Sequence, residues 1–195
     1  MKERPILFSG EMVRAILDGR KTQTRRIVKM PIDYHKWCEF QYSGVPGKYI
    51  FNSQARNVYH EIACPYGNPG DRLWVCETWD DVQAKNQHDP TDISKNILYR
   101  ADFQEEEKKG EFKWKWTSSI HMPRWASRID LEIIDVRVER LQDISNQDIR
   151  AEGVCVRGCV THRLNMQMLW DSLNEKRGFG WDTNPWVWVV EFRRK

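Results

Sequence analysis

The first apolar stretch of the chain has helical spacing. Four residues share one face of a helix with 3.6 residues per turn: Met12, Val13, Ile16 and Leu17. Ser9 stands where a side chain can cap the first turn, and Gly19 follows the last apolar residue, as glycine often does at a helix C-terminus. The pattern predicts a short helix between Ser9 and Gly19.

Segments rich in β-branched and aromatic residues predict strands. Four segments have this composition: residues 22–28, 73–79, 129–141 and 186–192. A Pro-Gly-Asp turn signal at residues 69–71 precedes the second of them. The alternation of the third slips at Ile133 and Ile134, which indicates a bulge or a bend.

Two further helices fit between the last two strands. Ser145 and Asp148 have the spacing of a capping box, so they predict a short helix that ends near Gly153. Thr161 can cap a longer helix that Gly178 ends. Its apolar stripe consists of Leu164, Met168, Leu169 and Leu173, widened by Met166 and Trp170. We interpret this stripe as core rather than as part of a ligand site.

Together these elements predict an α+β, mainly β fold in a single domain that spans residues 1–195. Two segments, at about 31–68 and 80–118, lack sustained periodicity and are interpreted as long loop insertions. Because long loops within compact domains often serve binding, both are candidates for substrate contact.

Composition narrows the class of protein. Of the 195 residues, 40% are hydrophobic and 30% are charged. No window approaches the roughly 20 apolar residues that a membrane-spanning helix needs, and the N-terminus has no secretory pattern. We therefore expect a cytoplasmic protein without a membrane partner. Its five cysteines are scattered and odd in number, which favours free thiols.

Charge and aromatic content point towards nucleic acid, although neither decides it. The net charge is only +3, but residues 1–30 hold eight basic and three acidic side chains, whereas residues 80–111 hold nine acidic and five basic ones. This asymmetry fits a positive side that attracts phosphates, or two solvated faces without a partner. Ten tryptophans are about four times the usual number, and they serve either a core or a cleft.

Familiar catalytic and metal motifs are absent from the sequence. There is no Gly-rich phosphate loop, no GxSxG and no HExxH motif. Cys155 and Cys159, with His162 nearby, supply only three potential zinc ligands. We expect neither a metal ion nor a cofactor.

The segment Gly19-Arg20-Lys21-Thr22-Gln23-Thr24-Arg25-Arg26 carries the most distinctive chemistry. Thr24 can act as a nucleophile if Lys21 is neutral enough to take its proton, and neighbouring arginines favour that neutral form. The alternative is a solvated basic turn that only contacts phosphate oxygens.

This segment, taken with others, resembles the ASCH family of the PUA-like superfamily. The matching segments are residues 6–9 with the helix that follows them, 17–25, 69–75, 129–141, 149–153 and 185–192. The Trp-rich last strand and residues 120–128 are similar to longer ASCH proteins of bacteriophages and prophages.

The resemblance implies a PUA-like β-barrel with flanking helices and a cleft for RNA, a modified nucleoside or single-stranded nucleic acid. Small ASCH proteins include amidohydrolases of N(4)-acetylcytidine, whose Lys, Thr and Glu correspond to Lys21, Thr24 and Glu152 here. The implied reaction is attack by Thr24 on the acyl carbon, with Lys21 as base, Glu152 at the leaving amine and a cation such as Arg26 at the oxyanion. Because strand residues three apart face opposite sides, Lys21 must lie in a turn.

A base taken out of a stack needs aromatic rings in place of its neighbours, and the second insertion is rich in them. The candidate substrate-binding residues are Arg20, Arg25, Arg26, Trp79, Trp114, Trp116, Arg124 and Trp125. Packing of a long loop onto the barrel is the alternative role for these rings. The sequence thus favours a hydrolase that removes an acyl group from a modified base, with a non-catalytic RNA-binding module or a ribonuclease as alternatives. It leaves the oligomeric state open.

Overall fold

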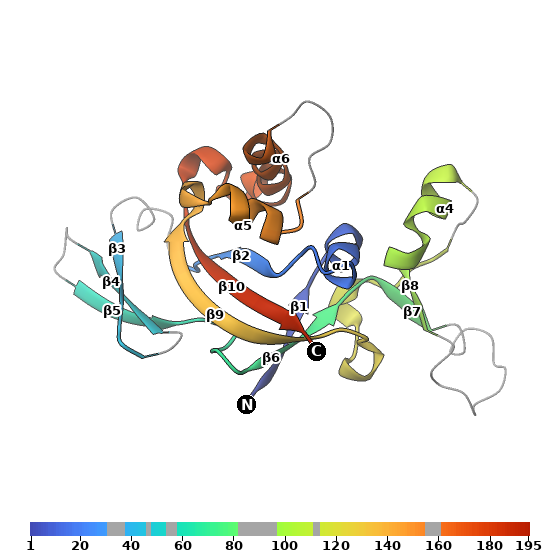
Figure 1. Cartoon of the computed structure of the whole chain (residues 1–195), viewed down its shortest axis with the longest axis horizontal. Coiled ribbons are helices and arrows are strands. Elements are labelled where there is room, and N and C mark those ends of the chain that lie inside the picture. Colours follow the sequence, from blue (N-terminus) through green and yellow to red (C-terminus); the bar gives the residue numbers. More distant parts are fainter. Residues whose placement is uncertain (31–37, 46–47, 54–57, 82–96, 111–113, 155–160) are drawn as a thin grey trace.

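The computed structural model describes residues 1–30, 38–45, 48–53, 58–81, 97–110, 114–154 and 161–195. Its centre is a curved five-stranded sheet with the strand order β1-β6-β9-β10-β2 (Figure 1). The strands span Glu3–Leu7 (β1), Arg72–Cys76 (β6), Asp130–Arg140 (β9), Trp186–Arg194 (β10) and Gln23–Ile27 (β2). Among the described strands of this sheet, β1 and β6 pair in parallel and the other neighbours are antiparallel. The α+β, mainly β class predicted from the sequence is confirmed.

The sheet is open between its two edge strands. Among the described strands, no pairing joins β1 to β2, so the predicted barrel is not closed there. The Arg26 side chain crosses this opening, where its Nη2 donates a hydrogen bond of 2.7 Å to the carbonyl of Leu7. A side chain therefore links the two edges in place of a backbone ladder.

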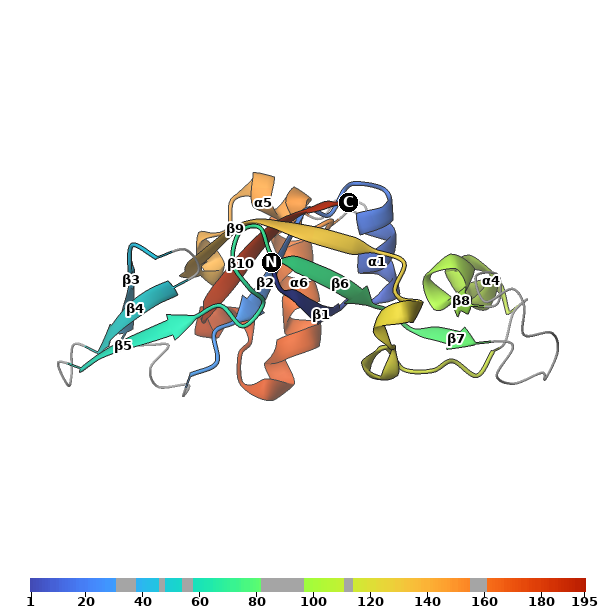
Figure 2. The ribbon, with the colours of Figure 1, turned by 90° about the horizontal axis from the view of Figure 1, so that it is seen from below.

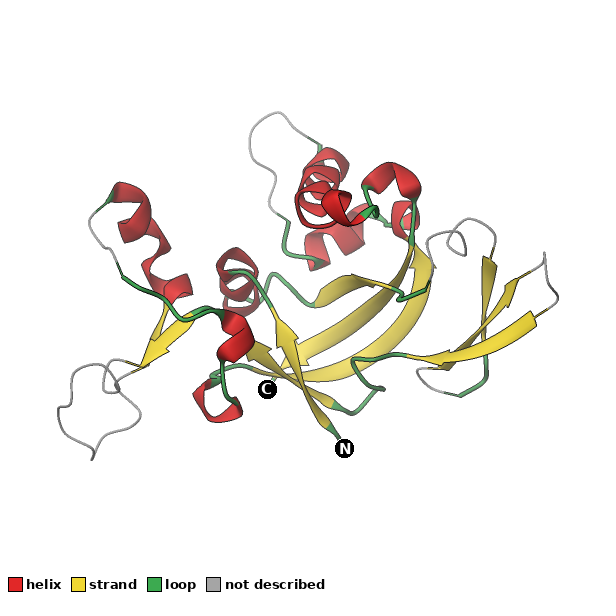
Figure 3. Cartoon of the chain, turned by 180° about the vertical axis from the view of Figure 1, so that it is seen from behind, coloured by secondary structure: helices red, strands yellow, loops and turns green. Residues whose placement is uncertain are grey.

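Strand β10 has an apolar core on each of its faces, which explains its nearly continuous hydrophobic sequence. Trp188 and Val190 pack into the main core with α1 (Gly10–Leu17). Val187 and Val189 pack under α5 (Asn146–Ala151) and α6 (His162–Asn174), which lie over the other side of the sheet (Figure 3).

Local signals in the sequence predicted several element ends correctly. The Ser145–Asp148 capping box is present, and the Thr161 hydroxyl caps α6. Ser9 occupies the cap position of α1, but its side chain makes no capping bond. The register between β9 and β10 skips Ile134, which is the predicted bulge.

The apolar stripe of α6 lies only partly in the core, so the interpretation of the whole stripe as core is wrong for its exposed members. Leu164, Met168 and Leu173 are exposed, whereas Met166 and Trp170 are buried. The buried residues lie four apart, so the helix turns this narrower line towards β10. Leu173 instead lines a cavity between α6 and β2.

The two segments interpreted as loop insertions contain regular structure at opposite ends of the molecule (Figure 2). The first forms a three-stranded antiparallel sheet of β3 (Cys38–Tyr42), β4 (Lys48–Ser53) and β5 (Val58–Ala63). The second forms β7 (Trp79–Asp81), β8 (Ile97–Tyr99) and α4 (Gln104–Lys109). Residues 31–37, 46–47, 54–57, 82–96 and 111–113 of these segments lie outside the described residues. Antiparallel pairing between successive strands forms these sheets, and the periodicity of a single segment does not report such pairing.

Candidate functional site

The turn between α1 and β2 holds Lys21 outside the regular strand, as predicted. Gly19 has a φ of 72°, a left-handed conformation that glycine adopts without strain. The backbone N–H groups of Arg20 and Lys21 both donate to the carbonyl of Ala15 in α1, at 2.8 and 2.9 Å. Lys21 also forms an isolated β-bridge with Glu152. The turn is therefore fixed between the ends of α1 and α5.

The ammonium group of Lys21 is fully buried and uses all three of its N–H donors. Nζ donates to the carbonyls of Gln23 (2.8 Å) and Glu152 (2.9 Å) and to Oε2 of Glu152 (2.8 Å). Burial lowers the pKa of Lys21 and outweighs the attraction of Glu152; Arg26 and Arg25 lower it further. The bond to the Gln23 carbonyl places the amine beside the peptide that leads into Thr24.

Glu152 connects Lys21 to a second buried cation. Its Oε1 accepts a hydrogen bond of 3.1 Å from Nη1 of Arg25, while Oε2 accepts from Lys21. Arg25 also forms ion pairs with Glu139 and, at 3.6 Å, with Asp148. The carboxylate of Glu152 is thus held in place from both sides.

A glycine lets the end of α5 approach Lys21 this closely. Gly153 has a φ of 79°, and a Cβ at this position would lie 2.9 Å from the Cβ atoms of both Ala15 and Lys21. Any larger residue would push the Glu152 segment away from the turn.

Alternation along β2 separates two groups of side chains. Gln23 and Arg25 point towards Asp148 at the start of α5. Arg26 points the other way, towards Leu7 and the ring of Phe8, whose centroid lies 5.3 Å from its guanidinium. Thr24 shares the parity of Arg26 and lines a cavity; its hydroxyl makes no hydrogen bond to any residue that the structure describes.

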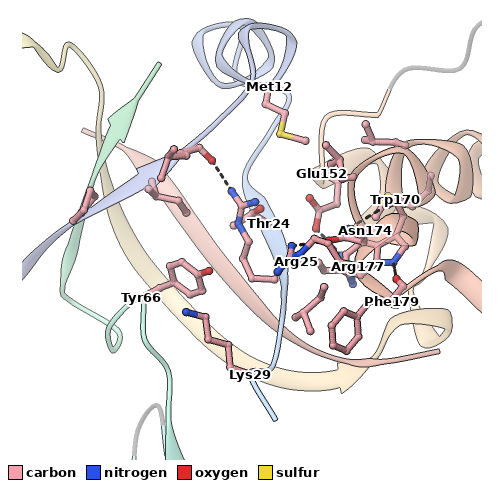
Figure 4. A pocket seen from close by; sticks show the side chains of 18 of the residues that line it. Met12, Thr24, Arg25, Lys29, Tyr66, Glu152, Trp170, Asn174, Arg177 and Phe179 are labelled. Atoms are coloured by element: carbon pink, nitrogen blue, oxygen red, sulfur yellow. Dashed lines mark hydrogen bonds and ion pairs between the residues drawn. The ribbon is translucent and has the colours of Figure 1, made fainter. Parts of the chain in front are cut away.

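The cavity has a volume of about 650 Å³ and lies at the opening between β1 and β2. This volume is within the range of small-molecule sites. Figure 4 shows Thr24, Arg25 and Glu152 on one side of it and Tyr66 and Lys29 on another. The remaining wall comes from α6 and the segment after it: Met166, Leu169, Trp170, Leu173, Asn174, Arg177 and Phe179. A smaller pocket of about 490 Å³ shares Met12, Glu152 and Leu169 with it.

The cavity is positively charged. Among the described residues, Arg26, Lys29 and Arg177 line it without a carboxylate within ion-pair distance. Glu152 is the only acidic side chain among the described residues of the lining, and Lys21 and Arg25 already neutralise it. Burial lowers the pKa of the Arg26 guanidinium, as expected for a cation with little compensation.

The structure brings only part of the predicted substrate-binding set to this region. Arg25 and Arg26 line the large cavity, and Arg20, which pairs with Asp18, lines the smaller pocket. The aromatic candidates and Arg124 line neither.

These other candidates pack at the β7–β8 end. The indole N–H groups of Trp114 and Trp116 donate to Asp80 and Glu107. Trp79 is buried with its ring edge-on to that of Trp125, 5.8 Å away, and Arg124 pairs with Glu3 and Asp130. Packing accounts for Trp79, Trp114 and Trp116 in this arrangement, whereas Trp125 remains exposed.

Sequence reasoning missed several residues of the cavity. Tyr66, Trp170, Arg177 and Phe179 were not among the candidates, and the apolar face of α6 that joins them had been interpreted as core. The one signal in the sequence was the amphipathic pattern of α6, which shows that the helix has an apolar face but not what lies against it.

Within the described residues, no group of three or more His, Cys, Asp or Glu side chains is placed to hold a metal ion. Cys155 and Cys159 lie outside those residues. None of the helices in the described part of the chain combines the length and the apolar character needed to span a bilayer.

Comparison with known proteins gives one structural likeness. No protein-family model matches the sequence, and no curated protein matches it. The match to one solved structure covers 99% of this chain and 79% of the other chain, with a TM-score of 0.45 and 10% sequence identity. The solved structure is an ASCH domain, from Lactobacillus crispatus JV V101. The sequence motifs resemble the same family, but a likeness at this score does not establish an activity, so the functional argument depends on the site itself.

Proposed function

We propose that the chain binds a modified nucleoside or base in the 650 Å³ cavity and hydrolyses an acyl group from it, with N(4)-acetylcytidine as the first substrate to test. One observation carries the proposal: the hydroxyl of Thr24, which bonds to no described residue, lines the same cavity as Glu152 and Arg25 of the buried Lys21–Glu152–Arg25 cluster. A hydroxyl next to a coupled acid and base is the arrangement that nucleophilic acyl transfer requires.

Each proton transfer in the proposed mechanism has a named donor and acceptor. Transfer of a proton from Lys21 to Glu152, across 2.8 Å, produces a neutral amine and a carboxylic acid. The amine takes the proton of Thr24 as its oxygen attacks the acyl carbon, and Glu152 protonates the departing amine of the base. Arg26 stabilises the developing oxyanion. Departure of the amine returns Lys21 and Glu152 to their charged forms. Glu152 then takes a proton from the water that attacks the acyl-threonine ester and passes it to the Thr24 oxygen as the acid is released.

The low pKa of Lys21 supports this assignment, because less free energy is needed to reach the neutral amine than for a solvated lysine. Burial of the ion pair also supports it. In a site of low dielectric, the neutral and charged forms of a Lys–Glu pair differ less in free energy than they do in water.

The experiment measures acetate release from N(4)-acetylcytidine by the purified chain and by two matched threonine variants. Thr24→Val removes the hydroxyl without removing a hydrogen bond, so we expect loss of turnover, by at least 10²-fold, in a folded protein. Thr22→Val is the control, since Thr22 is an exposed residue outside the cavity lining, and it should retain full turnover. Absence of acetate from a panel of acylated nucleosides would refute the hydrolase.

Binding without turnover is the second candidate. It is favoured by the complete use of the Lys21 donors, which leaves the amine no lone pair in the resting state. In that case Thr24→Val lowers nucleoside affinity only slightly, and no variant releases acetate.

A further inference from the structure

The cavity is polarised along its depth. Its inner wall is apolar and aromatic and includes Met166, Trp170 and Phe179, of which Met166 and Trp170 are buried. Its mouth is cationic, because Lys29 and Arg177 are exposed, whereas Arg26 lies deeper and is partly buried. A ligand that fits both parts has a flat apolar body and an anionic end.

Tyr66 marks the place where the anionic end would lie. Its ring lines the cavity, and its hydroxyl makes no hydrogen bond to a described residue, so a donor is free there. Burial raises the pKa of Tyr66, while the positive charges of Arg26 and Arg177 act on the same hydroxyl in the opposite direction. The field of both guanidinium groups therefore reaches one point at the cavity. Figure 4 shows the Lys29 amine directed towards the Tyr66 ring.

No carboxylate of the described residues neutralises these cations. Guanidinium and ammonium groups left without an acidic partner around one opening are the usual means of binding phosphate. Figure 4 shows Tyr66 and Lys29 across the cavity from Glu152, whereas Arg177 lies on the α6 side, so an anion held near Tyr66 and Lys29 is kept away from that carboxylate.

We propose that Tyr66, Lys29 and Arg177 form a phosphate subsite, so that the ligand of this cavity is a nucleoside monophosphate rather than a free nucleoside. This rests on the proposed binding of a nucleoside in the cavity. The base lies against the wall formed by α6, the acylated amine faces Thr24, and the phosphate accepts hydrogen bonds from Tyr66 and Arg177 at the mouth.

The test compares equilibrium binding of cytidine, cytidine 5′-monophosphate and inorganic phosphate by calorimetry, in buffer of low ionic strength. These probes are not acylated, so binding is measured without turnover. Charge-assisted hydrogen bonds to phosphate should make the monophosphate bind about 10- to 100-fold more tightly than cytidine. Raising the salt concentration should reduce this ratio.

Matched variants separate a subsite from general attraction. Arg177→Gln should reduce the ratio of the two affinities about tenfold. Lys176→Gln removes the same charge from the neighbouring exposed residue, which does not line the cavity, and should leave the ratio unchanged. Both positions are exposed, so neither variant threatens folding.

Equal affinity for cytidine and its monophosphate would overturn the proposal, as would equal losses in the two variants. A three-nucleotide single strand that binds tightly while the monophosphate shows no preference over cytidine would also overturn it, in favour of a strand-binding groove. The outcome is independent of acetate release: a preference for the monophosphate without hydrolysis refutes the hydrolase alone, and hydrolysis without the preference refutes the subsite alone.

Discussion

Replacing Glu152 with glutamine tests whether the buried charge cluster has the strength that its geometry indicates. The substitution preserves shape and removes the negative charge between two cations whose side chains are 0% exposed. The substitution weakens two charge-assisted hydrogen bonds, each of which contributes about 1.5–3 kcal/mol to the free energy of unfolding. Lys21 retains two backbone carbonyls, and Arg25 retains Glu139 and Asp148. We therefore expect the lower end, a loss of about 3 kcal/mol in the free energy of unfolding.

Urea denaturation followed by tryptophan fluorescence measures this loss as a lower midpoint at constant slope. In a domain of this size, the melting temperature should fall by about 6–12 °C. Adding Lys21→Met to the Glu152→Gln variant removes one of the stranded cations, so the double variant should be more stable than Glu152→Gln alone.

Glu132→Gln is the control for the loss of a surface charge. Glu132 pairs with Arg193 and Lys195 at the exposed end of β10, and its replacement should leave the urea midpoint unchanged. A loss of less than about 1 kcal/mol in Glu152→Gln, or a double variant no more stable than the single one, would refute the idea that this carboxylate holds two buried cations.

Further predictions concern separate features of the site and the core. Gly153→Ala should cost about 1–3 kcal/mol of unfolding free energy, measured in urea, because the backbone is left-handed there and the new Cβ meets Ala15 and Lys21 at 2.9 Å. Leu173→Ser should change stability by no more than about 0.5 kcal/mol, since Leu173 is 50% exposed, yet weaken nucleoside binding; a large destabilisation would restore it to the core. Because burial lowers the pKa of Lys21, the unfolded chain binds more protons than the folded one between that pKa and 10.5, so this group makes stability rise with pH there; Lys21→Met should flatten the rise in denaturation curves measured at several pH values. Burial raises the pKa of Cys64 to about 11, so its alkylation by iodoacetamide at pH 8, followed by peptide mass spectrometry, should be slow until urea unfolds the chain.

Local signals in the sequence explain which elements were predicted well. The Ser145–Asp148 box and the Thr161 cap satisfy backbone donors within one helical turn, so they act wherever the helix lies. The bulge at Ile134 is likewise indicated by the alternation of apolar and polar residues within its own strand. Lys21 was placed in a turn because strand geometry forbids it to share a face with Thr24.

Predictions about which other element a segment packs against succeeded less often. The stripe of α6 was amphipathic, but periodicity does not say whether an apolar face meets a core or a cavity. Similarly, Trp114 and Trp116 lie in a segment rich in aromatic residues, yet their indole groups bond to Asp80 and Glu107 far from Thr24. Whether a side chain is buried depends on the element that packs against it. The sequence of one element does not say which element that is.

The sequence by itself determined the chemistry that this protein carries: a Lys, a Thr and two arginines within one turn and strand, with a glutamate at the end of a capped helix. Only the tertiary structure decided that the Lys and the Glu, separated by 131 positions, lie 2.8 Å apart, and that the Thr hydroxyl faces an open, positively charged cavity. The physical reason is that short-range hydrogen bonds and side-chain periodicity fix single elements. The contact between the α5 end and the α1–β2 turn depends instead on how a sheet of distant strands curves and where it stays open.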